Sequence, residues 1–234
     1  MFIYSEQNGC FRPNYPSYIL NRIENNETSQ WILNAGIPEK PLIDWARQFM
    51  SEDKDFVDIG AHMGTYTISL APLCKNVHSF EAQRMTYYQL CGGIILNSLE
   101  NTYAYNVALG SNEESGQYKH LFISTIDGGG STVSQKVAVR SHIIKEEVVK
   151  MKCLDDYKLS NVGFIKIDVE GYEYNVLRGA ICTLTQNNFP PILFECWTDE
   201  WFQEDKQNVF NLLQSLGYKI VSISNYPNMF LASI

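Results

Sequence analysis

The sequence predicts an α/β fold in which a mostly parallel sheet carries helices on both faces. Short apolar runs alternate with segments that repeat apolar residues at helical spacing. Strands that alternate with helices favour parallel pairing, because each helix returns the chain to the start of the next strand. The apolar runs lie at residues 56–59, 77–80, 102–107, 164–168, 192–195, 218–222 and 228–232. The last two runs are close in sequence and predict a terminal antiparallel hairpin.

The helices are predicted from apolar spacing and from residues that begin or end helices. Pro38 suits the first turn of a helix, and Gly217 stands where a C-terminal cap is expected. Inside the third helix, Gly92 and Gly93 cost helix stability, which indicates close packing by another element. The predicted helices lie at about 38–50, 65–73, 83–99, 176–184 and 209–216.

The chain is predicted to divide into an N-terminal extension or cap, residues 1–50, and a main domain, residues 51–234. The first part is rich in Asn, Tyr, Ser and Glu and has weak periodicity. Within the main domain, residues 111–150 depart from the strand-helix alternation and predict a β-rich insertion. Its segment 128–130 is all glycine, which fits the hinge of a lid or a flexible surface turn.

Composition narrows the class of protein. The chain has 234 residues and a formal charge of −8, from 18 basic and 26 acidic residues, so non-specific binding to nucleic acid or an anionic membrane is disfavoured. It has no stretch of transmembrane length and no signal-peptide pattern at its start, so we expect a cytoplasmic setting. The six cysteines form no C-x-x-C pair, which predicts reduced thiols and no metal site.

The first strand ends in a glycine loop with the spacing Asp58, Gly60, Gly64. Glycines let backbone amides approach a ligand, and ligands of open α/β sheets bind where such strands end. The second strand ends at Glu81, where an acidic side chain typically binds the hydroxyls of a ribose. The pattern predicts a cofactor that contains a nucleoside. It lacks the G-x-G-x-x-G fingerprint of dinucleotide sites and has an acid before its first glycine, which favours S-adenosylmethionine over a nicotinamide cofactor.

The sequence resembles the FkbM-type methyltransferases over roughly residues 55–196. The most diagnostic segment surrounds Asp168. The matching segments are 56–67, 79–83, 106–110, 154–157, 165–173, 176–180 and 192–195. The resemblance implies a Rossmann-like class I methyltransferase fold with a mostly parallel seven-stranded sheet. It also implies S-adenosylmethionine-dependent O-methylation of a small-molecule acceptor, such as a nucleotide sugar or a glycan, by a monomer or homodimer.

The resemblance also implies roles for individual residues. Those expected around the methionine portion of the cofactor are Asp58, Gly60, Ala61, His62 and Gly64. Those expected around its nucleoside are Glu81, Ala82, Asn106, Val107 and Ala108. Asp168 is expected near the methyl group, where it binds the cofactor amine, orients the acceptor or serves as the base.

An alcohol is a weak nucleophile, so a positioned base is expected to assist the transfer. The candidates are Asp168, Glu170, Glu195, His142 and His62, with Asp168 first. Two alternative functions are methylation of RNA, which the acidic balance disfavours, and non-catalytic binding of S-adenosylmethionine.

Overall fold

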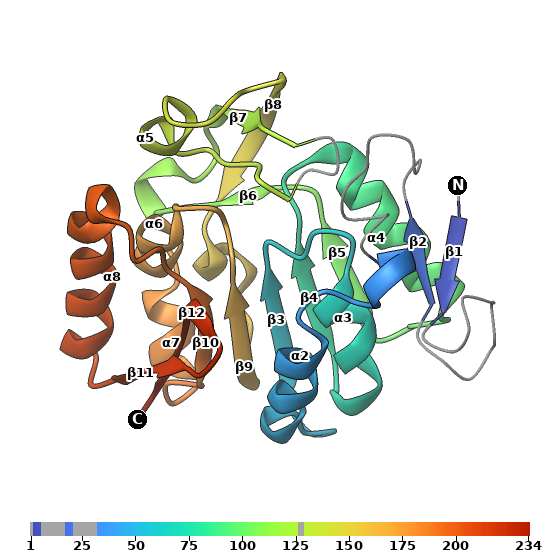
Figure 1. Ribbon diagram of the computed structural model, residues 1–234. Coiled ribbons are helices and arrows are strands. Elements are labelled where there is room, and N and C mark those ends of the chain that lie inside the picture. The colour runs from blue at the N-terminus through green and yellow to red at the C-terminus, as the bar shows by residue number, and fades with distance from the viewer. Residues whose placement is uncertain (1, 6–16, 21–31, 126–128) are drawn as a thin grey trace.

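The computed structural model describes residues 2–5, 17–20, 32–125 and 129–234. Its centre is a seven-stranded sheet with the order β11-β12-β10-β9-β3-β4-β5 (Figure 1). The parallel strands are β3 (Asp55–Ile59), β4 (Val77–Phe80), β5 (Thr102–Tyr105), β9 (Val162–Ile167) and β10 (Ile192–Glu195). The antiparallel strands are β11 (Lys219–Ile223) and β12 (Tyr226–Ser233). The predicted fold class, including the terminal hairpin, is confirmed.

Alternating side chains of the strands build a separate core on each face of the sheet. Val57 and Ile59 of β3 pack on the side of α6, α7 and α8, whereas Phe56 packs on the side of α2 and α3. Burying one such side chain stabilises the fold by about 1.5–3 kcal/mol. The main helices are α2 (Lys40–Ala46), α3 (Thr65–Leu70), α4 (Arg84–Leu96), α6 (Glu173–Arg178), α7 (Ile181–Gln186) and α8 (Gln203–Ser215).

The glycine pair inside α4 is explained by close packing, as predicted. A Cβ atom on Gly93 would lie 2.6 Å from Cδ1 of Ile68 in α3. A Cβ atom on Gly92 would lie 2.3 Å from Cδ1 of Ile19 in β2 (Ser17–Leu20). β2 pairs antiparallel with β1 (Phe2–Ser5). Because Gly92 has no side chain, this pair of strands from the start of the chain can pack closely against α4.

Residues before β3 contribute to the core of the main sheet. Leu42, Ile43 and Ala46 of α2 are buried in the same cluster as Phe56 and Phe164. The domain boundary predicted at residue 50 stays a prediction, and the hydrophobic core includes residues on both sides of it.

The helix predicted at residues 176–184 is two helices, which was not expected. The break lies at Gly179, where a Cβ atom would come 2.0 Å from the carbonyl oxygen of Gly110. The Gly179 carbonyl accepts a bond of 3.0 Å from the amide of Asp155. The Asp155 carboxylate then accepts bonds of 2.7 and 2.8 Å from the amide and hydroxyl of Thr183 in α7. Contacts far along the chain thus end α6 and support the start of α7.

The insertion forms a three-stranded sheet with the order β6-β8-β7. Its elements are β6 (Ala108–Leu109), β7 (Tyr118–Ile123), α5 (Gln135–Ala138) and β8 (Lys145–Lys152). Its small core packs against Ala82 and Val169, which follow β4 and β9. The insertion therefore lies over the end of the main sheet, at the top of Figure 1. Gly128 of the predicted hinge lies outside the described residues.

The described cysteines are unpaired, and Cys74, Cys153 and Cys196 are buried, as expected for reduced thiols. Cys182 is exposed, and Cys10 lies outside the described residues. Within the described part of the chain, no helix has the length and apolar character needed to span a membrane.

Candidate functional site

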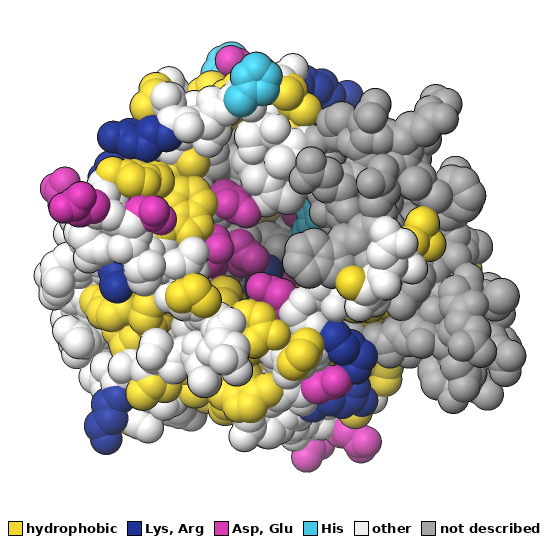
Figure 2. Space-filling view, viewed as in Figure 1, with side chains coloured by type: hydrophobic (Ala, Val, Ile, Leu, Met, Phe, Trp, Pro, Cys, Tyr) yellow, Lys and Arg dark blue, Asp and Glu magenta, His cyan; other side chains and the backbone are white. Residues whose placement is uncertain are grey.

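A cavity of about 280 Å³ opens where β3, β4 and β9 end. Its walls come from these strand ends, from the turn before α2 and from the insertion. Figure 2 shows acidic side chains gathered around a hollow near the centre of one face. Among the predicted cofactor residues, those that line the cavity are Gly60, Ala61, His62, Glu81, Ala82, Val107, Ala108 and Asp168.

The glycine loop is wedged between two strand ends. The amides of Gly60 and Ala61 both donate to the carbonyl of Phe80 at 3.0 Å. Gly60 has a φ of +75°, and a Cβ atom on it would lie 1.7 Å from the carbonyl oxygen of Asp168. Only glycine therefore fits this position.

Asp58 lies beneath the cavity instead of lining it. Its side chain is fully buried, and Oδ2 accepts bonds of 3.1 Å from the amide and 2.6 Å from the hydroxyl of Thr67. Its Oδ1 has no hydrogen-bond partner among the described residues and lies 4.0 Å from Nζ of Lys166. The structure thus gives Asp58 a role in fastening α3 and balancing a buried lysine. Gly64 is likewise outside the cavity lining and begins α3 with a φ of 93°.

Glu81 connects the end of β4 to the glycine loop. Oε2 accepts a bond of 2.9 Å from the amide of His62, and Oε1 accepts one of 2.8 Å from the amide of Gln83. Burial raises the pKa of this carboxyl. Each carboxylate oxygen has a second lone pair, so both can still accept hydroxyl protons. Asn106 is exposed and outside the lining; its side-chain amide supports this corner by donating to the carbonyls of Glu81 and Ala82 at 2.8 and 3.0 Å.

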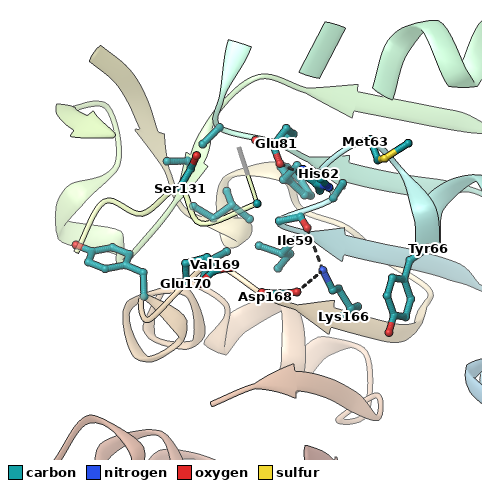
Figure 3. Close-up of a pocket in the computed structure, with 18 of the residues that line it drawn as sticks. Ile59, His62, Met63, Tyr66, Glu81, Ser131, Lys166, Asp168, Val169 and Glu170 are labelled. Carbon is teal, nitrogen blue, oxygen red and sulfur yellow. Dashed lines mark hydrogen bonds and ion pairs between the residues drawn. The ribbon is translucent and has the colours of Figure 1, made fainter. Parts of the chain in front are cut away.

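Lys166 is a buried cation at the opposite side of Ile59 from Glu81 (Figure 3). Its Nζ donates to the carbonyl of Gly60 at 2.9 Å and lies 3.2 Å from Oδ2 of Asp168. Burial alone lowers a lysine pKa, but the charges of Asp168, Asp58 and Glu39 outweigh it and raise the pKa of Lys166. The lysine is therefore charged, and it holds the glycine loop and Asp168 in one arrangement.

Three carboxylates meet beside the cavity. Asp168, Glu170 and Glu195 each offer an oxygen, and these oxygens lie within 4.8 Å of one another. Burial, together with the charges of Asp168, Glu170 and Glu173, raises the pKa of Glu195 to about 11. In the part of the chain that the structure describes, the buried Oε2 of Glu195 has no hydrogen-bond partner. The three carboxylates together can share protons or hold a cation. The raised pKa favours the protonated form of Glu195 at neutral pH, which argues against Glu195 as a base.

The turn that carries Asp168 is built by residues that follow it. Glu170 has a φ of 54° and Gly171 a φ of 87°, which reverse the chain after β9. Oε1 of Glu173 accepts bonds of 3.2 Å from the amides of Val169 and Gly171. Glu173 thus caps the turn, and the side chains of Asp168 and Glu170 are left to line the cavity.

The two histidines proposed as bases lie in different places. His62 lines the cavity, whereas His142 is exposed on the loop before β8 and is outside the lining. Two cavity residues, Glu39 and Tyr66, had no signal in the sequence that marked them as functional. Tyr66 lies in the matching segment 56–67 but carried no assigned role, Glu39 lies outside the matching segments, and folding brings both to the cavity that Asp168 lines.

The family is decided by sequence comparison. The profile of the FkbM methyltransferase domain matches residues 58–220. The chain belongs to the FkbM methyltransferase family. Its cofactor is S-adenosylmethionine, and the cavity fits this cofactor: the Gly60 turn offers close backbone contact, and Glu81, Asp168 and Glu39 surround it with negative charge suited to a cationic ligand.

Solved structures show the same fold. FkbM methyltransferase from Methylobacillus flagellatus KT has a TM-score of 0.52 and 17% identity, over 78% of this chain and 44% of that chain. This chain thus spans less than half the length of that relative. Precorrin-6y C5,15-methyltransferase from Geobacter metallireducens GS-15 has a TM-score of 0.50 and 11% identity, over 85% and 88% of the two chains. Among curated proteins, no sequence matches this chain.

Proposed function

We propose that this FkbM-family methyltransferase transfers a methyl group to a hydroxyl oxygen of a small acceptor, with sugars and glycoconjugates as the acceptor class. The observation that supports this is the acidic wall made by Asp168 and Glu170, with Glu195 beside it. Carboxylates accept hydrogen bonds from hydroxyl groups, and they repel the phosphates of a nucleic acid. A nucleotide sugar would have to keep its phosphates away from this wall.

In this proposal the residues that hold S-adenosylmethionine divide by the part they contact. The backbone of Gly60, Ala61 and His62 supports its centre, Glu81 accepts bonds from the ribose, and Ala82, Val107 and Ala108 cover the adenine. When bound, the cofactor supplies an electrophilic methyl group on a sulfonium.

Asp168 is the proposed base for the acceptor hydroxyl. It lines the cavity and has 28% of its side chain exposed, so an acceptor can reach it. Lys166 holds it in position from the buried side at 3.2 Å. Glu170 is the second candidate because it shares the same wall, whereas His142 lies outside it. A cytoplasmic setting and a monomer or homodimer complete the proposal.

The experiment is methyl transfer from labelled S-adenosylmethionine to a panel of nucleotide sugars, glycans and RNAs. We expect transfer to a hydroxyl-rich small molecule, with kcat lowered about 10²–10⁴-fold in Asp168→Asn and cofactor affinity changed far less. Transfer to RNA alone would reject the acceptor class. Full activity in Asp168→Asn would reject Asp168 as the base, and cofactor binding without transfer to any acceptor would favour a non-catalytic module.

A further inference from the structure

One wall of the cavity comes from outside the segment that matches the family profile. Pro38 and Glu39 line the cavity, although the match begins at residue 58. Glu39 has a φ of 54° and a ψ of 19°, in the left-handed region, which is unfavourable for an L-residue. Its carbonyl accepts the amides of Leu42 and Ile43 at 2.8 and 2.9 Å, so the start of α2 maintains this conformation. Backbone strain of this kind is common at functional sites, and here it lies at Glu39 in the cavity wall.

The side chain of Glu39 is held at the same end of the cavity as Asp168. Oη of the buried Tyr66 donates to Oε2 of Glu39 at 2.8 Å, and the Tyr66 ring lies 5.3 Å from Nζ of Lys166. Burial and the charge of Asp168 raise the pKa of Glu39, whereas Lys166 and the Tyr66 hydroxyl act in the opposite direction. The carboxylates of Glu39 and Asp168 therefore lie at the same end of the cavity, and the hydrogen bond from Tyr66 orients the carboxylate of Glu39.

Three other acids of the site, Asp58, Glu81 and Asp168, already have partners. Asp58 is buried beneath the loop and bonds to Thr67, and both oxygens of Glu81 accept backbone amides. Oδ2 of Asp168 pairs with Lys166. Within the part of the chain that the structure describes, Tyr66 is the one hydrogen-bond partner of the Glu39 carboxylate. The Glu39 carboxylate thus keeps the capacity to accept further hydrogen bonds from a ligand.

We infer that Glu39 binds the α-ammonium group of the methionine portion of S-adenosylmethionine. With the nucleoside at Glu81, the amino-acid tail extends past Gly60 toward the end lined by Glu39, Tyr66 and Asp168. An ammonium offers three donors and a positive charge. Among the described residues, the carboxylates of Glu39, Asp58 and Asp168 surround one buried lysine, Lys166, so negative charge is in excess at this end. The inference assigns to Glu39 the contact that the sequence pattern suggested for Asp58. It rests on the cofactor assignment and does not depend on the acceptor.

Calorimetry with three ligands tests this assignment. S-adenosylmethionine and S-adenosylhomocysteine both carry the ammonium, whereas 5′-methylthioadenosine keeps the nucleoside and sulfur but lacks the amino-acid tail. We expect Glu39→Gln to weaken binding of the first two about tenfold, because the ammonium loses a charged hydrogen-bond acceptor. Binding of 5′-methylthioadenosine should stay unchanged. Tyr66→Phe should give a smaller loss with the same ligand pattern.

The matched control is Glu52→Gln, an exposed acid on the loop that precedes β3, which should bind all three ligands as the wild type does. Equal losses for all three ligands in Glu39→Gln would show a structural role and overturn the inference. Unchanged binding, or a loss confined to S-adenosylmethionine, would also overturn it, the latter because the sulfonium alone would be sensed. Failure of the wild type to bind any of the three would reject the cofactor assignment itself.

Discussion

Replacement of Gly60 by alanine tests whether the glycine loop and the turn at Asp168 form one site. The new Cβ atom would lie 1.7 Å from the Asp168 carbonyl oxygen and 2.8 Å from its carbonyl carbon. Ordinary carbon-oxygen contacts are about 3.3 Å or longer, so either the loop or the end of β9 must move by more than ~1 Å. The left-handed backbone adds about 1–2 kcal/mol, and overpacking typically costs a further 1–3 kcal/mol.

Gly116→Ala is the matched control for this change. Gly116 also has a positive φ, +85°, but a Cβ atom on it would have no neighbour within 4 Å. We therefore expect Gly116→Ala to cost about 1 kcal/mol and Gly60→Ala about 4 kcal/mol, or on the order of 10 °C in Tm. Thermal unfolding followed by circular dichroism measures both, and calorimetry should show loss of S-adenosylmethionine binding in Gly60→Ala alone. Equal stability of the two variants, with cofactor binding intact, would refute the described contact.

Three further predictions concern the buried charges. Burial raises the pKa of Glu173 to about 7 from an ordinary 4.5, so the unfolded chain loses this proton first and stability falls as pH rises from about 4.5 to 7. Glu173→Gln should remove that loss, and its free energy of unfolding relative to wild type should rise by on the order of 2–3 kcal/mol between pH 5 and pH 8; a pH-independent difference would contradict this. Lys166→Met should destabilise the fold by about 3–5 kcal/mol in urea unfolding, because it leaves buried carboxylates uncompensated; a neutral effect would show that water reaches them. Activity should survive EDTA, since shared protons can relieve the repulsion among three carboxylates; a loss restored by Mg²⁺ would assign a cation to Asp168, Glu170 and Glu195 instead.

The sheet could be predicted because its strands carry a local signal. Each buried parallel strand is a short apolar run, and β3 and β4 are followed directly by the glycine and the acid that were predicted to bind the cofactor. Glu81 was found in this way, whereas Asp168 follows β9 and was expected from the family resemblance; both line the cavity. The order of the strands carries no such local signal and was not predicted; the family resemblance supplied the number of strands in the sheet.

The features that were not predicted depend on contacts between residues far apart in the sequence. The side-chain amide of Asn97 bonds to the backbone of Ser17 at 2.6 and 2.8 Å, a contact that leaves no periodic trace in the sequence. The same reason explains why the break at Gly179 was missed, because it depends on Gly110. Spacing placed Asp58 at the end of a strand, but it could not show that the side chain points away from the cavity and toward Thr67.

The most direct test of the account is calorimetric titration of S-adenosylmethionine into the wild type and Glu81→Ala. The cavity and the contacts of Glu81 predict that the wild type binds one cofactor per chain. They predict at least about tenfold weaker binding by Glu81→Ala, because the ribose loses a charged acceptor and the His62 amide loses its partner. Absence of binding by the wild type, or equal affinity in a folded Glu81→Ala variant, would contradict the assignment of this cavity to the cofactor.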